Sequence, residues 1–182
     1  KTSITASFAF LGAPDLVCAD CDVDAADMHL LLEPDRARTE DFYSGELACI
    51  RRDACIACGK CAEVCRFDAV EVQDGVYTIK DIDCEGCGYC ARVCPAGAID
   101  MKPRNVGTWH VSGTRLGCTM VHARLGIGAE NSGKLVAKVK NEAKRAAEET
   151  GKRIVLVDGS PGIGCPVVSS LSGADFVVLV TE

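Results

Sequence analysis

Apolar residues recur along the two outer parts of the chain with helical spacing in some segments and as short continuous runs in others. Short apolar runs that alternate with amphipathic segments are typical of buried parallel strands connected by helices. The pattern therefore predicts an α/β fold, a parallel sheet with helices on both faces. The expected helices are residues 2–11, 24–32 and 131–150, and the expected strands are residues 15–20, 153–158 and 174–181.

The middle of the chain has a different pattern. Residues 33–44 are polar and indicate a loop, and residues 109–124 mix β-branched residues with glycines. Between these segments, two short strands at 69–72 and 76–79 flank a turn at Gly75. We therefore expect a small unit inserted into the α/β domain. The expected boundaries are 1–49 for the first part of the α/β domain, 50–103 for the insertion and 104–182 for the second part.

Cysteine content changes this picture most, because 13 of the 182 residues are cysteines. Eight of them form two runs of the form C-x2-C-x2-C-x3-C, and residues 55–71 repeat at 84–100 with eight of 17 positions identical. Such self-similarity indicates a duplicated metal-binding unit. The eight cysteines are Cys55, Cys58, Cys61 and Cys65 in the first run, and Cys84, Cys87, Cys90 and Cys94 in the second.

The spacing of these runs is that of bacterial two-cluster ferredoxins, in which the fourth cysteine of each run binds the other cluster. Zinc is the alternative, but zinc sites usually consist of two separated C-x2-C pairs. We therefore predict an α+β ferredoxin domain with two [4Fe-4S] clusters. The first cluster is assigned to Cys55, Cys58, Cys61 and Cys94, and the second to Cys84, Cys87, Cys90 and Cys65. Pro95 follows Cys94 as the pattern expects, whereas Arg66 follows Cys65.

Overall composition excludes several other classes. Hydrophobic residues make up 48% of the chain, and a formal net charge of -6 argues against a nucleic-acid partner. The sequence contains no run of eighteen apolar residues, so it predicts no membrane span, and it shows no secretory signal. The odd cysteine count and tight spacing disfavour an extracellular disulfide framework. We therefore expect a cytoplasmic protein.

Three motifs outside the insertion resemble a known family. Residues 1–3 (KTS) open a helix as the end of a phosphate-binding loop does, residues 17–24 (VCADCDVD) end a strand in acid, and residues 158–164 (DGSPGIG) contain D-x-x-P-G. Together they resemble the MinD/ParA-type (deviant Walker) P-loop ATPases that contain a ferredoxin domain. Residues 22–32 (DVDAADMHLLL), 121–125 (VHARL) and 130–135 (ENSGKL) support this resemblance.

The resemblance implies a magnesium–ATP site. Lys1 would contact the β- and γ-phosphates, Thr2 would bind magnesium, and Asp20 and Asp158 would hold the ion through water. Asp22 would be the catalytic residue that orients the attacking water. The glycine-rich half of the loop, the family's additional loop lysine and the segments that bind the base are absent from the sequence. We therefore expect a fragment of a longer ATPase, inactive in this form, with a strand edge exposed beside the missing strand.

Other polar residues carry weaker signals. Asp24 and Asp27 suit a solvated loop or a helix start as well as a site. The three histidines, His29, His110 and His122, have no partner pattern and are expected to be structural. Cys18 and Cys21 form a C-x2-C pair that could hold a transferable cluster at a subunit interface, but buried core cysteines are the simpler interpretation. Cys165, beside the D-x-x-P-G motif, could respond to nucleotide, and Cys49 and Cys118 carry no signal.

Three functions remain open from the sequence. The first is an iron–sulfur ATPase that couples ATP to electron transfer with a redox partner protein, as a possible homodimer. The second is a carrier that delivers clusters to an acceptor protein. The third is a ferredoxin-type electron carrier on a scaffold without ATPase activity.

Overall fold

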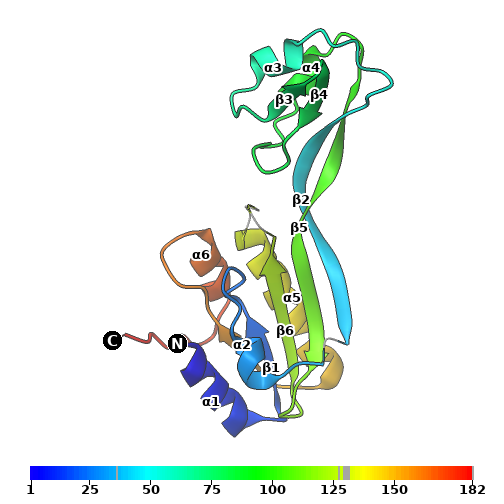
Figure 1. Cartoon of the computed structure of the whole chain (residues 1–182). Coiled ribbons are helices and arrows are strands. Elements are labelled where there is room, and N and C mark those ends of the chain that lie inside the picture. The colour runs from blue at the N-terminus through cyan, green and yellow to red at the C-terminus, as the bar shows by residue number, and fades with distance from the viewer. Residues whose placement is uncertain (36, 127, 129–131, 182) are drawn as a thin grey trace. The chain divides into compact units, whose positions relative to one another are not determined.

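The computed structural model describes residues 1–35, 37–126, 128 and 132–181 (Figure 1). Its contacts divide the chain into two compact units, one formed by residues 1–42 and 106–182 and the other by residues 43–105. The expected insertion was 50–103, so the second unit begins earlier, within a long strand. Residues 130 and 131, which begin the motif 130–135 and the expected helix 131–150, lie outside the described residues.

The sheet is mixed rather than parallel, which corrects part of the predicted fold class. Its strands are ordered β2-β5-β6-β1-β7, and β1 pairs in parallel with both β6 and β7. However, β5 and β6 are antiparallel, because a tight turn closed by the Gly117 N–H and the Thr114 carbonyl joins them. The bounds are Leu16–Asp20 for β1, Arg38–Ile50 for β2, Ile99–Gly113 for β5, Thr119–Leu125 for β6 and Ile154–Asp158 for β7.

The first half of strand β2, residues 38–44, lies in the segment 33–44 that the polar sequence predicts to be a loop. Most side chains of its first half are exposed, so the strand has no buried face that would give a hydrophobic alternation. Thr39, Phe42 and Tyr43 are the β-branched and aromatic residues that favour a strand there. The boundary between the two units falls within β2 and within β5.

Helices cover both faces of the sheet, as the sequence predicted. Alternate residues of β1 point to opposite cores: Val17 and Ala19 pack with α5 (Ser132–Thr150), whereas Leu16 and Cys18 pack with the residues of α1 (Thr2–Gly12) and α2 (Met28–Leu32). This double coverage explains why every residue of β1 is buried. None of the described helices is long and apolar enough to cross a membrane.

Residues 174–181 do not form the strand that their apolar sequence predicts. Among the described residues β7 pairs only with β1, so β7 is the edge of the sheet, and the segment that follows α6 (Cys165–Leu171) does not join it. The Ala174 N–H donates to the Leu171 carbonyl oxygen, but the segment has no neighbouring strand among the described residues to pair with. Phe176 is accordingly 84% exposed and Leu179 83% exposed.

The second unit consists of two similar halves around a small core. The short helices α3 (Lys60–Val64) and α4 (Tyr89–Val93) occupy equivalent places in the sequence repeat. Between them, β3 (Val70–Gln73) and β4 (Val76–Ile79) form the predicted antiparallel hairpin, with Gly75 at a φ of 74° in its turn. Apolar residues from the hairpin, β2 and β5 pack with five of the cysteines.

Lys140 of α5 holds the end of α6. Its ammonium donates hydrogen bonds to the carbonyl oxygens of Ser169 at 3.0 Å, Ser170 at 2.9 Å and Ser172. These carbonyls lie at the carboxyl end of α6, where the helix leaves backbone acceptors unsatisfied. Lys140 therefore fastens α6 to α5.

We expect Lys140→Met to loosen α6 without unfolding the sheet. The variant keeps the aliphatic length but leaves the carbonyls without their charged donor, which costs roughly 1–3 kcal/mol. Hydrogen exchange of the α6 backbone amides should become faster, and exchange in β1 should not change. Lys144→Met, an exposed position on the same helix, is the matched control. Equal protection of α6 in both variants would contradict the prediction.

Candidate functional site

The first predicted cluster site coincides with a cavity in the second unit. Cys55, Cys58 and Cys61 line this cavity together with Cys94, which lies 33 residues further along the chain. Cys94 ends α4, and its sulfur accepts a hydrogen bond of 3.3 Å from the Ala98 N–H. The structure thus brings the four assigned residues to one place. The apolar part of the lining is formed by Ile50, Ile56, Ala96, Ala98 and Ile99.

The second predicted site repeats the local geometry of the first. Cys65 ends α3 in an extended conformation (φ −74°, ψ 112°), and Cys94 ends α4 in nearly the same one (φ −70°, ψ 111°). Cys65, Cys84 and Cys90 belong to the same apolar cluster, and Cys87 is exposed as Cys58 is. The second set therefore has the same pattern of local structure as the first.

Glycines shape both cysteine loops. Gly59 precedes α3 with a φ of 77°, and Gly88 precedes α4 with a φ of 71°, a region that side-chain-bearing residues rarely adopt. This turn lets the helix that contains the third cysteine of each run begin two residues after the second cysteine. Gly86 has a second constraint, because a Cβ there would lie 2.2 Å from the Glu46 carbonyl oxygen.

The donors of both cysteine sets fit an iron–sulfur group, because each set supplies four thiols in the two-cluster ferredoxin spacing. Burial raises the pKa of the Cys61 and Cys90 thiols. Such thiols become thiolates when a cationic metal group binds, so occupancy would also stabilise this small unit.

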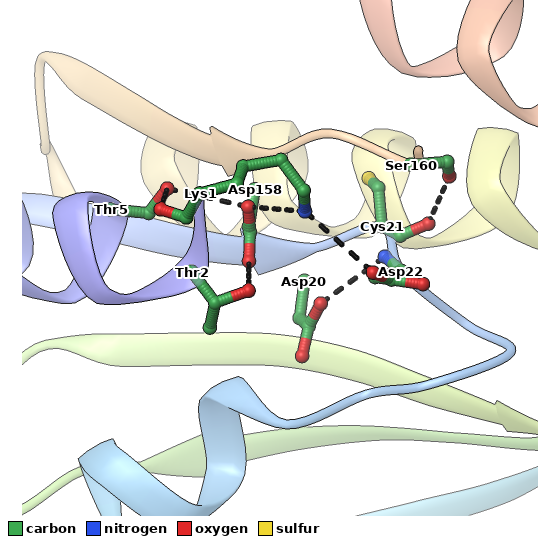
Figure 2. A network of polar contacts seen from close by, with 8 residues as sticks. All are labelled: Lys1, Thr2, Thr5, Asp20, Cys21, Asp22, Asp158 and Ser160. Atoms are coloured by element: carbon green, nitrogen blue, oxygen red, sulfur yellow. Dashed lines mark hydrogen bonds and ion pairs between the residues drawn. The ribbon is translucent and has the colours of Figure 1, made fainter. Parts of the chain in front are cut away.

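A second candidate site lies at the carboxyl ends of β1 and β7, beside the start of α1 (Figure 2). The Lys1 ammonium is 2.7 Å from Asp158 Oδ1, and the Thr2 hydroxyl donates to Asp158 Oδ2 at 2.7 Å. Lys1 also lies 3.7 Å from Asp22 Oδ2. Thr5, which the motif analysis did not single out, donates to Asp158 Oδ1 at 3.3 Å. Four of the five predicted nucleotide-site residues are thus in direct contact.

Asp20, the fifth, is fully buried next to this group. Its Oδ1 accepts the Asp22 N–H at 3.2 Å, while its Oδ2 has no hydrogen-bond partner among the described residues. Burial raises the Asp20 pKa to about 7, with repulsion from Asp158 and Asp22 adding to this rise and the backbone N–H groups of Asp22 and Met28 opposing it. A buried carboxylate oxygen without a partner is costly and marks a place where a cation would be favourable.

We expect Asp20→Asn to stabilise the protein above pH 7 when no divalent cation is present. Because the folded-state pKa lies above the ordinary value of 3.8, the folded chain holds this proton more tightly than the unfolded chain. The contribution of Asp20 to stability therefore falls as pH rises from about 4 to about 7. Below about pH 4, Asp20→Asn should leave the free energy of unfolding unchanged. Above about pH 7, it should raise the free energy of unfolding by on the order of a few kcal/mol.

Denaturant unfolding of both proteins at several pH values measures this difference. The exposed Asp24→Asn variant is the control and should follow the unmodified protein throughout. A gain of equal size at both ends of the pH range would attribute the effect to packing instead of charge.

Five cysteines lie outside the two runs: Cys18, Cys21, Cys49, Cys118 and Cys165. Cys18 and Cys21 are buried in the cores on opposite faces of the sheet, so they cannot share a cluster while β1 is intact. The Cys18 sulfur lies 4.0 Å from that of Cys118. Cys165 is exposed at the start of α6, and Cys49 is half-buried in β2.

The histidines make contacts with other protein groups. The rings of His110 and His122 stack with centroids 4.7 Å apart, and His110 Nδ1 lies 2.8 Å from the Thr39 hydroxyl. His29 Nδ1 contacts the Ala26 carbonyl oxygen. These contacts agree with the structural roles predicted for the three residues.

Comparison with known proteins identifies the second unit. Over its whole length the chain is 37% identical to an uncharacterized protein of Methanocaldococcus jannaschii, in an alignment of 184 positions. The chain spans 63% of the length of this relative. Residues 48–101 match the family model described as a 4Fe-4S dicluster domain. The prediction of a ferredoxin-like iron–sulfur unit is therefore confirmed, and this part of the chain is a 4Fe-4S dicluster domain.

Proposed function

We propose that this protein carries electrons through two [4Fe-4S] clusters, and that magnesium–ATP binding and hydrolysis in the other unit control this transfer. The observation that carries the electron-transfer part is the cavity that Cys55, Cys58 and Cys61 line with the distant Cys94. A bound cluster accepts and releases one electron at a time. The chain's own residues hold the group, shield it with apolar side chains and leave Cys58 exposed toward a partner.

Metal analysis of the anaerobically isolated protein tests the first part. We expect about eight iron atoms and about eight sulfide ions per chain. Zinc without sulfide, or about four irons with the second cysteine run unprotected against alkylation, would contradict it.

The nucleotide part of the proposal rests on the contacts of Lys1 and Asp158. The Lys1 ammonium forms an ion pair of 2.7 Å with Asp158. Phosphates would attract Lys1, and the Asp158 carboxylate and Thr2 hydroxyl would become free to hold magnesium, directly or through water. The buried oxygen of Asp20 would face the same ion, and Asp22 would orient the attacking water. Most of the catalysis in such a site is positioning and charge neutralisation.

A movement of Asp158 would be transmitted to other parts of its unit through the residues that follow it. Asp158 ends β7, and the residues after it lead directly into α6, whose far end Lys140 holds. The Ser160 hydroxyl in this loop also bonds to the Cys21 carbonyl oxygen, next to Asp22. A change at the phosphates would therefore alter a loop that is connected to both strand ends. Such local switches are the usual way in which nucleotides control larger movements.

Two simpler functions are alternatives. Delivery of clusters to an acceptor protein through Cys18 and Cys21 is disfavoured, because the two residues lie on opposite faces of the sheet. Electron transfer without any ATPase activity would leave the Lys1, Thr2 and Asp158 contacts as purely structural. Equilibrium binding of magnesium–ATP to the full-length protein, with and without EDTA, separates this case from the proposal.

A further inference from the structure

The two cysteine sets are similar in fold and overall exposure: each has one exposed, two half-buried and one buried cysteine, the buried one being Cys61 in the first set and Cys84 in the second. Each loop has a glycine of positive φ before its helix, an exposed second cysteine and a fourth cysteine that ends the helix of that half. Solvent exposure and backbone geometry would therefore affect two bound clusters similarly. Any difference between the two sites must come from the side chains that the repeat does not preserve.

Charge is the first such difference. Within the loop 55–61 the one charged residue is Lys60, and within the loop 84–90 it is Glu85. The repeat places Tyr89 where the first loop has Lys60, and Ile56 where the second has Glu85. Lys60 also lines the cavity of the first site.

The wider segments carry the same asymmetry. Residues 51–66 have four basic and two acidic side chains, a net charge of +2. The equivalent residues 80–95 have two basic and three acidic side chains, a net charge of −1. Two arginines contact the second half of the repeat: Arg51, already counted in the first segment, donates to the Gly97 carbonyl oxygen and pairs with Asp100, and Arg104 donates to the Cys84 carbonyl oxygen at 3.0 Å. Within the loops themselves the difference in charge remains Lys60 against Glu85.

Hydrogen-bonding capacity is the second difference. The Tyr77 hydroxyl lies 3.2 Å from the point that a Cβ on Gly59 would occupy, and Tyr77 lines the first cavity. At the equivalent Gly88 the neighbour is Met101, whose sulfur lies 4.0 Å from the corresponding point. A phenol can donate a hydrogen bond to a thiolate or sulfide, whereas a thioether has no proton to donate.

We propose that the site of Cys55, Cys58, Cys61 and Cys94 has the higher reduction potential of the two. This inference rests on the proposed function, in that it requires both sites to hold clusters. Reduction adds one negative charge, which Lys60 and a Tyr77 donor stabilise and which Glu85 disfavours. One electron from a low-potential donor therefore comes to rest at the first site. When the Cys84 site passes an electron to the Cys55 site, the former is oxidised and the latter reduced, so electrons leave the domain near Cys58.

The test exchanges residues between the two halves of the repeat. Lys60→Tyr should lower the midpoint potential of the first site alone, and Glu85→Ile should raise that of the second site alone. Tyr77→Phe should lower the midpoint potential of the first site, because the hydroxyl donor is lost. Lys60→Arg and Glu85→Asp keep the charges and are the matched controls. The readout is a dithionite titration of the intact anaerobic protein followed by paramagnetic NMR of the cysteine β-protons, which identifies the reduced site.

Each outcome decides the inference. The inference is supported if the NMR signals of the reduced state first develop on the cysteines of the first site and the variants shift the midpoint potentials as described. Signals that first develop on the Cys84 set, or midpoints that do not respond to Lys60→Tyr and Glu85→Ile, overturn it while leaving a two-cluster carrier intact. Iron and sulfide well below about eight per chain overturn the proposed function itself, and this inference with it.

Discussion

Cys94→Ala combined with Cys58→Ala should retain about four iron atoms per chain, whereas Cys94→Ala combined with Cys87→Ala should retain almost none. The reason is that Cys94 and Cys58 line one cavity although they belong to different runs. If both substitutions remove ligands of the same cluster, only that cluster is lost. If each substitution removes a ligand of a different cluster, both clusters are lost. The double variants therefore test the crossed assignment more sharply than single variants do.

Cys65 offers the reciprocal experiment. Cys65→Ala with Cys87→Ala should keep the first cluster, and Cys65→Ala with Cys58→Ala should lose both. Cys49→Ala, a half-buried cysteine of the same unit outside the two runs, is the control and should leave the iron content unchanged. Iron and sulfide analysis after anaerobic reconstitution gives the measurement. If Cys94→Ala with Cys58→Ala lost all iron, each run would hold its own cluster and the crossed assignment would be wrong.

The dicluster domain was predictable from sequence because its determinants are local. Three cysteines of each run lie on one tight loop, and the spacing alone limits how the loop folds. The exposed positions of Cys58 and Cys87 follow from the same loop in both copies. The contributions of Tyr77 and Met101 were not predictable, because both residues reach the loops from strands that are distant in sequence.

Errors in the larger unit have two physical causes. Strand β2 was missed because its exposed first half has no buried face and hence no hydrophobic period. Residues 174–181 were wrongly predicted as a strand because apolar, β-branched sequence indicates the propensity to pair but cannot supply a partner. The antiparallel β5–β6 pair depended on the short turn at Gly117, a local signal that the apolar pattern alone did not weigh.

The candidate site at Lys1 and Asp158 shows what the resemblance adds to reasoning from local sequence. Lys1 and Asp158 are separated by 157 positions, and nothing in their local sequence predicts that they touch. The family motifs led us to expect both residues at one site. The ion pair of 2.7 Å and the hydroxyl contact of Thr2 supply the geometry on which the proposed role of this site rests.

Asp22→Asn should reduce magnesium-dependent ATP hydrolysis by about 10²-fold or more while leaving nucleotide binding nearly unchanged. Asp22 lies at the edge of the polar network, 3.7 Å from Lys1, and burial raises the pKa of its carboxyl, with Lys1 opposing that rise. An asparagine of the same shape keeps the position but cannot act as a base toward water. Phosphate release and ATP binding are both measured on the full-length protein.

Two comparisons determine what a loss of activity means. Asp158→Asn removes a direct acceptor of Lys1 and Thr2, so it should weaken magnesium–ATP binding as well as turnover, in contrast to Asp22→Asn. Asp24→Asn changes an exposed carboxylate two residues from Asp22 and should do neither. If Asp22→Asn and Asp24→Asn hydrolysed ATP at the same rate, Asp22 would not be the residue that orients water. If neither Asp22→Asn nor Asp158→Asn affected binding or hydrolysis, the polar network would be structural, and the two clusters would act without nucleotide control.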